Sequence, residues 1–180
     1  MRREVIFAGF GGQGIVLAGY VLGRAVAIHE NRHAVLMQSY GPEARGGACS
    51  ASVVIADEAI DYPYVRQADT IVLLSREAAA RFGGKAGTEC TVLYDERLVP
   101  EPPTQGDCHG IPATRIAEQV GTRMAANVVM LGFLAGKTDV VSADALREAV
   151  LETVPGKFKD LNEKAFAQGL AHASRSEVPA

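Results

Sequence analysis

The first thirty residues combine a short apolar run, a cluster of glycines and a long apolar stretch without proline. Val5–Ala8 predicts a buried strand, and residues 15–28 predict a buried helix. Between them, residues 9–14 read Gly-Phe-Gly-Gly-Gln-Gly and fit the spacing G-x-G-x-x-G. A loop of this kind between a strand and a helix is typical of sites where the start of the helix faces a phosphate.

The glycine loop supports two interpretations. In the first, Gly9 permits a tight turn, Gly11 lets the backbone approach a phosphate, and Gly14 lets the helix pack on the strand. In the second, the glycines only allow close packing and the loop binds nothing. Gly12 and Gln13 complete this part of the candidate site, and Gln13 either reaches a ligand or hydrogen-bonds to a second loop.

Strands alternate with helices through most of the chain, and helices gather at its end. Predicted strands cover residues 33–38, 48–56, 69–74, 90–94 and 108–111, and predicted helices cover 76–82, 113–120, 122–135, 143–153 and 157–173. This order predicts one α/β domain, residues 1–180, with a Rossmann-like, mostly parallel sheet, helices on both faces and a helical C-terminal part. On the last helix we expect Phe158, Leu161 and Phe166 to share one face.

A second glycine-rich loop follows the strand predicted at residues 33–38. In a parallel sheet it emerges at the same edge as the first loop, so the two loops can line one crevice. An NAD site usually has Asp or Glu at the end of this strand, whereas Arg45 suits a phosphorylated ribose, as in NADP or coenzyme A. Alternatively, Glu43 and Arg45 pair with each other. The candidate ligand contacts in this loop are Ser39, Tyr40, Glu43, Arg45, Gly46 and Gly47.

Composition and charge exclude several classes of protein. Hydrophobic residues make up 48% and charged residues 22%, as in ordinary globular proteins, and no apolar run is long enough for a membrane helix. The formal net charge of −3 argues against a nucleic-acid surface. Cys49, Cys90 and Cys108 are far apart and form no C-x-x-C motif, so this chain alone supplies no iron–sulfur cluster and no cysteine zinc site. We expect them to be buried thiols in a cytoplasmic protein.

Two further features of the sequence, a histidine motif and two asparagines, each allow more than one interpretation. Residues 29–33 spell H-E-x-x-H, the zinc-peptidase spacing, but Asn31-Arg32 reads as a turn that separates the two histidines. We therefore expect no metal site, and a zinc hydrolase remains a rival that predicts one bound zinc per chain. Asn127, in an apolar helical stretch, either bridges backbone groups inside the core or contacts a ligand or partner, and Asn162 has the same two interpretations. No catalytic residue is assigned.

The two loops together resemble a known family. Residues 9–14 followed by residues 39–47 look like the gamma subunits of 2-oxoacid:ferredoxin oxidoreductases. The resemblance extends to Asp61-Tyr62-Pro63 with Ala68-Asp69, to Ala126-Asn127-Val128, and to Leu161-Asn162-Glu163-Lys164-Ala165-Phe166, so it covers most of the chain. The reading Tyr-Gly-Pro-Glu-Ala-Arg-Gly-Gly at residues 40–47 is most similar to the 2-oxoglutarate type.

The resemblance implies a role within a complex. Such enzymes oxidatively decarboxylate a 2-oxoacid, transfer the acyl group to coenzyme A and reduce ferredoxin. Thiamine diphosphate and iron–sulfur clusters are expected on the alpha, beta and ferredoxin-like delta subunits. This chain is then expected to contribute assembly and to be inactive alone. From the glycine loop and Arg45 we further hypothesise that it helps to hold coenzyme A. The rivals are a stand-alone NADP-binding protein or reductase, and a purely structural subunit.

Overall fold

The structure is a computed structural model, and it describes residues 1–40 and 47–175. The strands of its sheet are β1 (Arg2–Phe10), β2 (His33–Tyr40), β3 (Ala48–Ala56), β4 (Thr70–Leu73), β5 (Thr91–Asp95) and β6 (Asp107–Ile111). Its helices and helical turns are α1 (Ile15–Arg24), η1 (Ala25–His29), α2 (Arg76–Phe82), η2 (Gly83–Lys85), α3 (Ala113–Val120), η3 (Arg123–Ala125), α4 (Ala126–Lys137), α5 (Ala143–Thr153), η4 (Gly156–Phe158) and α6 (Lys159–Arg175).

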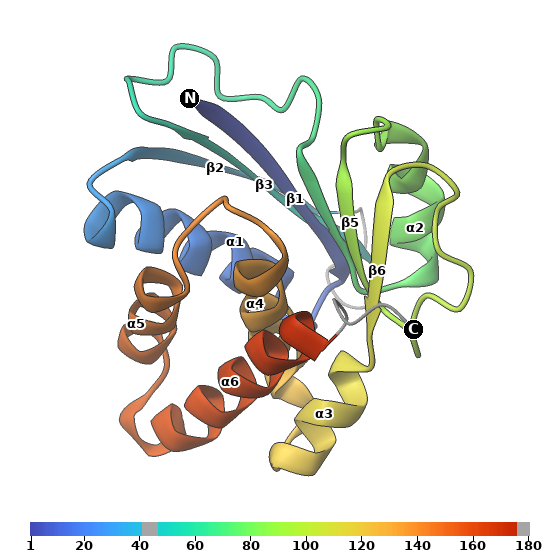
Figure 1. Ribbon diagram of the computed structural model, residues 1–180, viewed down its shortest axis with the longest axis vertical. Coiled ribbons are helices and arrows are strands. Elements are labelled where there is room, and N and C mark those ends of the chain that lie inside the picture. Colours follow the sequence, from blue (N-terminus) through green and yellow to red (C-terminus); the bar gives the residue numbers. More distant parts are fainter. Residues whose placement is uncertain (41–46, 176–180) are drawn as a thin grey trace.

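The sheet has the strand order β2-β3-β1-β4-β5-β6 (Figure 1). Strands β1, β4, β5 and β6 run parallel to one another, as predicted. Strand β3 is antiparallel to both β1 and β2 and separates them. Strands β2 and β3 are too close in sequence for the long crossover that parallel neighbours need, so they pair antiparallel. The α/β class is confirmed, and the sheet is mixed.

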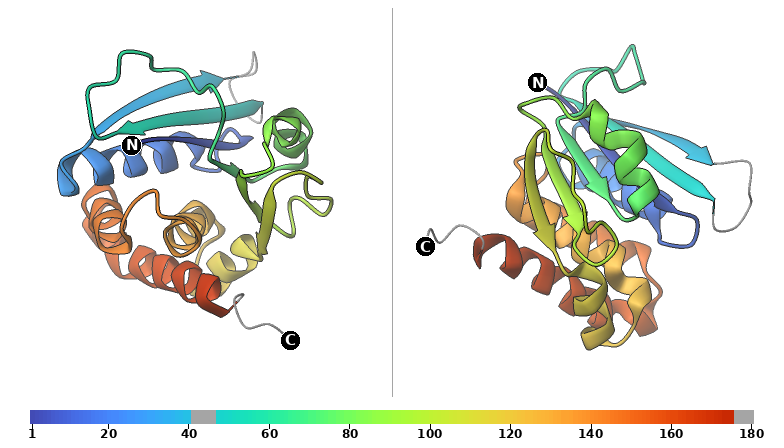
Figure 2. Two further views of the ribbon diagram at one scale, coloured as in Figure 1. Left: turned by 45° about the horizontal axis from the view of Figure 1, so that its top comes forward. Right: turned by 90° about the vertical axis from the view of Figure 1, so that its right-hand side faces the viewer.

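The alternation of side chains along β1 divides the interior into two cores. Val5 and Phe7 face a large core that also contains residues of α1, α3, α4, α5 and α6. Ile6 and Ala8 face a smaller core with α2. Helices therefore lie on both faces of the sheet, as expected from a strand that is buried on both sides. Figure 2 shows most helices gathered on one side and α2, in green, apart from them.

Helices α4 and α6 cross at two glycines. A Cβ atom on Gly132 would lie 2.1 Å from the carbonyl oxygen of Phe166, and one on Gly169 would lie 2.0 Å from that of Val129. The backbones therefore approach more closely than any larger residue permits. Together with α1, α3, α5 and β5, helix α6 encloses α4, and Asn127–Leu134 are all buried. No helix in the described ranges is both long and apolar enough to cross a bilayer.

The start of the last helix differs from the prediction. The segment expected to be helical from residue 157 begins as the turn η4, and α6 starts at Lys159. As a result, Phe158 is 43% exposed and does not share the buried face of Phe166.

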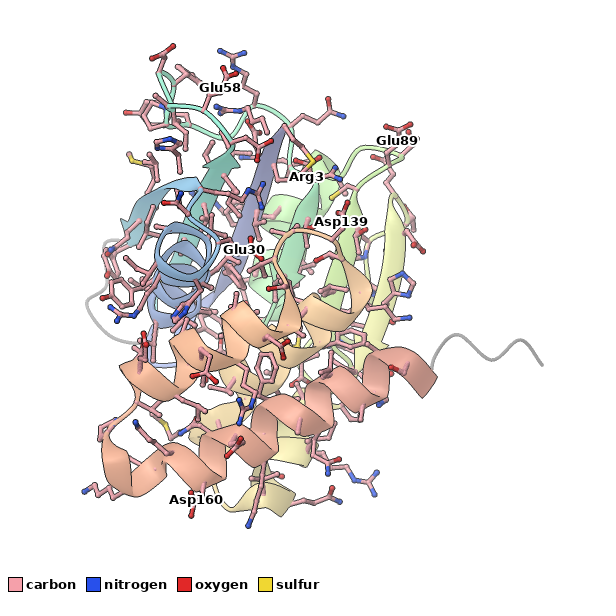
Figure 3. All side chains as sticks on the ribbon, turned by 60° about the vertical axis from the view of Figure 1, so that its left-hand side comes forward. Arg3, Glu30, Glu58, Glu89, Asp139 and Asp160 are labelled. Carbon is pink, nitrogen blue, oxygen red and sulfur yellow. The ribbon has the colours of Figure 1, made fainter. Side chains whose placement is uncertain are left out.

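An ion pair ties the sheet to the helical layer at the end remote from the glycine loop. Arg3 of β1 donates to the carboxylate of Asp139, just after α4, at 2.8 Å. Figure 3 shows these two side chains at the same end of the molecule as Glu89. The N-terminal strand is thereby joined directly to the C-terminal helical part.

Candidate ligand-binding site

The glycine loop turns at Gly12 and Gly14, where φ is +93° and +73°. Gly9 has no positive φ and lies within β1, so the expectation that it permits the turn is wrong. Its role is close packing, because a Cβ there would lie 2.4 Å from the Gln13 side chain and 2.8 Å from that of Ile15. The turn therefore depends on the third and fourth glycines of the loop.

Gly14 makes room for a side chain from a distant helix. It is the N-cap residue of α1, and a Cβ on it would lie 2.3 Å from the Nδ2 atom of Asn127 in α4. We expected this glycine to let the helix pack on the strand. Its neighbour is instead Asn127, whose Nδ2 donates to the Gly14 carbonyl oxygen at 3.3 Å.

Gln13 holds the glycine loop to the sheet. Its Oε1 accepts from the Phe10 N–H at 2.6 Å, and its Nε2 donates to the Leu74 carbonyl oxygen at 2.8 Å. The predicted ligand contact stays a prediction, and within the described residues the bonds of this side chain go to Phe10 and Leu74. The side chain stabilises the loop from within and fixes it to the end of β4.

The two loops meet at one edge of the sheet, as predicted. The N–H of Gly11 donates to the carbonyl oxygen of Gly47, at the start of β3, at 3.0 Å. This amide is therefore already paired within the protein. Alternation along β2 places Tyr40 at the cavity described below and directs Ser39 to the opposite face of the sheet. Glu43, Arg45 and Gly46 lie outside the described residues.

A cavity of about 800 Å³ lies against the glycine loop. Its lining comes from the glycine loop and the first turn of α1, from the ends of β2 and β3, and from η3, α4, η4 and α6. The lining is mainly apolar, and its size is that of an ordinary small-molecule pocket. Four exposed apolar side chains lie among its lining residues: Leu17, Tyr40, Met124 and Phe158.

The polar groups in this cavity are few and specific. The first turn of α1 carries N–H groups without partners inside the helix, and it has no acidic side chain and no side-chain cap. These features favour an anion at this point. The buried amides of Asn127 and Asn162 also line the cavity. Asn127 accepts from the Val128 N–H at 2.9 Å, and Asn162 donates to the Phe158 carbonyl oxygen at 2.9 Å.

Sequence reasoning missed most of the cavity wall. Thr122, Met124, Val154 and Pro155 come from segments distant from the glycine loop in sequence. The exposed Met124 at the start of a buried helix is a local signal, but its partners in space depend on the crossing of α4 and α6.

Residues 4–172 match the model of the family described as pyruvate ferredoxin/flavodoxin oxidoreductase.

The chain belongs to this family.

Two relatives indicate its place within the family. The chain is 45% identical over 173 residues to the 2-oxoglutarate synthase subunit KorC of Methanocaldococcus jannaschii, covering 94% of this chain and 92% of that protein. It is 37% identical to the ketoisovalerate oxidoreductase subunit VorA of Methanothermobacter thermautotrophicus, covering 92% of this chain and 35% of that protein. In the latter, the matching region is a part of a longer chain.

Solved structures agree with this placement. The gamma subunit of a keto/oxoacid ferredoxin oxidoreductase from Geobacter sulfurreducens superposes with a TM-score of 0.86 at 36% identity, covering 96% of this chain and 99% of that chain. The 2-oxoglutarate:ferredoxin oxidoreductase of Magnetococcus marinus shares the fold, with a TM-score of 0.85 at 22% identity, covering 99% of this chain and 32% of that one. The predicted resemblance to gamma subunits, of the KorC type, is confirmed.

The cysteine in the cavity of this gamma subunit is a buried thiol. Cys49 lines the cavity and is 6% exposed, and its burial raises the pKa of the thiol. No histidine or cationic side chain is among the cavity's described lining residues. A thiol in such surroundings stays protonated near neutral pH, which agrees with the interpretation that Cys49 is not a nucleophile.

The H-E-x-x-H residues of the gamma subunit do not share a helix face. His29 ends η1, His33 begins β2, and Asn31 between them has φ +53°. Glu30 accepts from the N–H of Ser142 at 2.7 Å and thereby joins the end of η1 to the start of α5. The predicted turn is confirmed. In residues 1–40 and 47–175 no three His, Cys, Asp or Glu side chains gather as a metal site.

Proposed function

We propose that this chain is the gamma subunit of a 2-oxoglutarate:ferredoxin oxidoreductase and that it holds coenzyme A in the cavity beside the glycine loop. The complex would convert 2-oxoglutarate, coenzyme A and two oxidised ferredoxins into succinyl-coenzyme A, carbon dioxide, a proton and two reduced ferredoxins. Thiamine diphosphate and iron–sulfur clusters would be held by the alpha, beta and ferredoxin-like delta subunits. The identity to 2-oxoglutarate synthase subunits supports this choice of substrate.

The observation that carries the coenzyme A proposal is the position of the apolar cavity directly at the start of α1. The free N–H groups and dipole of that helix suit a phosphate group. The apolar wall suits the uncharged part of a long ligand, and the amides of Asn127 and Asn162 can orient it. The fold is shared with the Magnetococcus marinus enzyme, whose structure contains coenzyme A.

Each part of the ligand has a separate protein partner in this proposal. Gly12 and Gly14 bring the backbone close to the phosphates, and Arg45 of the second loop pairs with the 3′-phosphate of the ribose. Coenzyme A supplies the thiol that accepts the acyl group when bound. The residues of this chain bind and orient the carrier, and the chemistry of the 2-oxoacid takes place on the other subunits.

The decisive test is steady-state kinetics of the purified complex with Arg45→Ala. Loss of one charge-assisted hydrogen bond should raise the KM for coenzyme A by roughly tenfold or more, with the KM for 2-oxoglutarate unchanged. Arg76→Ala, at an exposed position on α2, is the matched control and should change neither constant. A normal coenzyme A KM in Arg45→Ala would remove this role of the arginine.

The stand-alone NADP-binding alternative has less support. In a dinucleotide-binding fold the strand that recognises the ribose lies beside the first strand. Here β3 lies between β1 and β2, so the end of β2 is two strand spacings, roughly 10 Å, from β1. Titration of the isolated chain with NADPH separates the proposals, since micromolar binding would favour the alternative.

A further inference from the structure

The loop between β3 and β4 is held rigidly against the sheet although residues 57–69 contain no helix or strand. Glu4 of β1 is buried, and its Oε2 accepts from the N–H groups of Arg66 and Gln67 at 2.6 and 2.9 Å. Its Oε1 accepts from Arg2, which also donates to the carbonyl oxygens of Tyr62 and Tyr64. A long ordered loop, here fixed by the buried carboxylate of Glu4, is typical of a functional surface.

This rigid loop presents aromatic rings and a cation to the exterior. Tyr62 and Tyr64 are 44% and 53% exposed, and their ring centroids lie 5.4 Å apart. The guanidinium of Arg66 lies 4.8 Å above the ring of Tyr62. Tyrosine and arginine are enriched among the residues that dominate protein–protein binding energies. Their fixed positions also reduce the entropy lost when a partner binds.

Beside the tyrosines lies a hollow of about 520 Å³ on the face of the sheet away from α1. Its floor includes Ile6, Met37 and Phe82, and its cations are Arg66 and Lys85. No Asp or Glu is among its described lining residues. Lys85 lies 5.2 Å above the ring of Phe82, so both cations rest on aromatic rings. In a chain of net charge −3, this is a locally cationic surface with an apolar floor.

We propose that this surface, the Tyr62–Tyr64 ridge with the adjoining hollow, docks an acidic segment of another subunit of the same complex. The segment places an apolar side chain on the floor and carboxylates beside Arg66 and Lys85. The inference relies on the proposed function only in naming the partner as a subunit of the oxidoreductase. In VorA the region matching this chain is about a third of a longer protein, so the fold is found joined to further polypeptide.

The chemistry of the surface favours a polypeptide segment over a second copy of this chain or a small anion. A symmetric dimer through this patch would bring the same cations of two copies together. A small anion would leave the adjoining tyrosine ridge uncovered. A partner segment satisfies both parts of the surface, because the ridge and the floor of the hollow take apolar contacts while Arg66 and Lys85 take charge.

The test is reconstitution of the complex with the double variant Arg66→Glu/Lys85→Glu. We expect the affinity of the gamma subunit for the remaining subunits to fall at least tenfold, measured by size-exclusion chromatography and interferometry. The affinity of the unaltered chain should also fall as salt is raised. The matched control is Arg81→Glu, since Arg81 rests on the same Phe82 ring at 5.2 Å but does not line the hollow.

Two further measurements show whether a loss of affinity comes from the surface itself or from misfolding of the variant. Circular dichroism and thermal unfolding of each isolated variant check that it folds, and hydroxyl-radical labelling of the unaltered protein should show Tyr64 and Met37 protected on assembly. Equal retention of the double variant and Arg81→Glu, or unchanged labelling, would overturn the proposal. The proposal would also be overturned if the isolated chain formed dimers, or bound citrate at the hollow, and the double variant abolished that dimerisation or binding. The coenzyme A KM of the assembled fraction should stay normal, which separates this proposal from the one for Arg45.

Discussion

The side chain of Gln13 joins the glycine loop to Leu74, because its amide donates to the carbonyl oxygen of Leu74 while accepting from the N–H of Phe10. The loop is therefore fixed to the end of a neighbouring strand before any ligand arrives. In its proposed role, a loop held in this way would lose little entropy when coenzyme A binds.

Gln13→Ala should destabilise the protein and loosen the loop. It leaves the Phe10 N–H and the Leu74 carbonyl oxygen without their partner, which costs about 1–3 kcal/mol. Chemical unfolding of the isolated chain measures this loss, and the coenzyme A KM of the complex should rise with it. Gln119→Ala, at an exposed position on α3, is the control and should stay within roughly 0.5 kcal/mol. Equal stabilities of the two variants would contradict the role of Gln13.

Gly14→Ala should be more damaging than Gly12→Ala. Both residues have positive φ, which costs alanine roughly 1–2 kcal/mol. At Gly14 the new methyl group also collides with Asn127, whereas at Gly12 nothing lies within 4 Å. We expect about 3 kcal/mol or more at Gly14 from strain and overpacking together. Adding Asn127→Ala to Gly14→Ala should recover part of the loss, and a strictly additive double variant would argue against this contact.

Gly132→Ala should disrupt the crossing of α4 and α6. Its methyl group would meet the backbone of Phe166 at 2.1 Å, and backbone cannot move aside as a flexible side chain can. The expected loss is about 3 kcal/mol, seen as a lower midpoint in urea. Gly156→Ala adds the same group in η4, where nothing lies within 4 Å, and it should be tolerated. An unchanged midpoint for Gly132→Ala would show that the helices lie further apart.

Cys90 should make stability fall at alkaline pH. Burial, with smaller effects of Asp69 and Cys108, raises the pKa of this thiol from 9.0 to about 11. The unfolded chain therefore releases the proton first, so the stabilisation is complete below pH 9 and is lost as the pH rises towards 11. It amounts to about 2–3 kcal/mol. Urea unfolding at pH 8 and pH 11 should show a smaller decrease for Cys90→Ala, and equal decreases would refute the assignment.

The parts of the fold that depend on neighbouring residues were predictable from the sequence. The strand, glycine loop and helix at residues 2–24 follow from local hydrophobicity and glycine spacing, and the turn at Asn31 follows in the same way. The direction of β3 was harder, because a β-branched run reads alike in parallel and antiparallel pairing. The spacing G-x-G-x-x-G predicts a turn at Gly9, but the spacing does not show which glycines have positive φ, and in the structure these are Gly12 and Gly14.

Only one side of the cavity could be predicted from the sequence. Its glycine-loop side is local, whereas Met124, Pro155 and Leu161 reach it through the packing of α4 and α6, which no local pattern encodes. Asn127 was recognised as a polar residue in an apolar helix, but its contact with Gly14 spans most of the chain. The internal bonds of Gln13 could not be separated from ligand binding, since a glutamine amide serves either.

The central position of β1 bears on how the chain folds as it leaves the ribosome. This first strand pairs with β3 on one side and β4 on the other, and its Phe7 lies in the same core as Phe166. Because β1 precedes β4 and α6 in the sequence, it must wait for Thr70–Leu73 to complete the sheet around it, and for α6 to close the core. Nascent chains that stop before α6 should accordingly be captured by chaperones, because the apolar strand β1 emerges well before the elements that bury both of its faces.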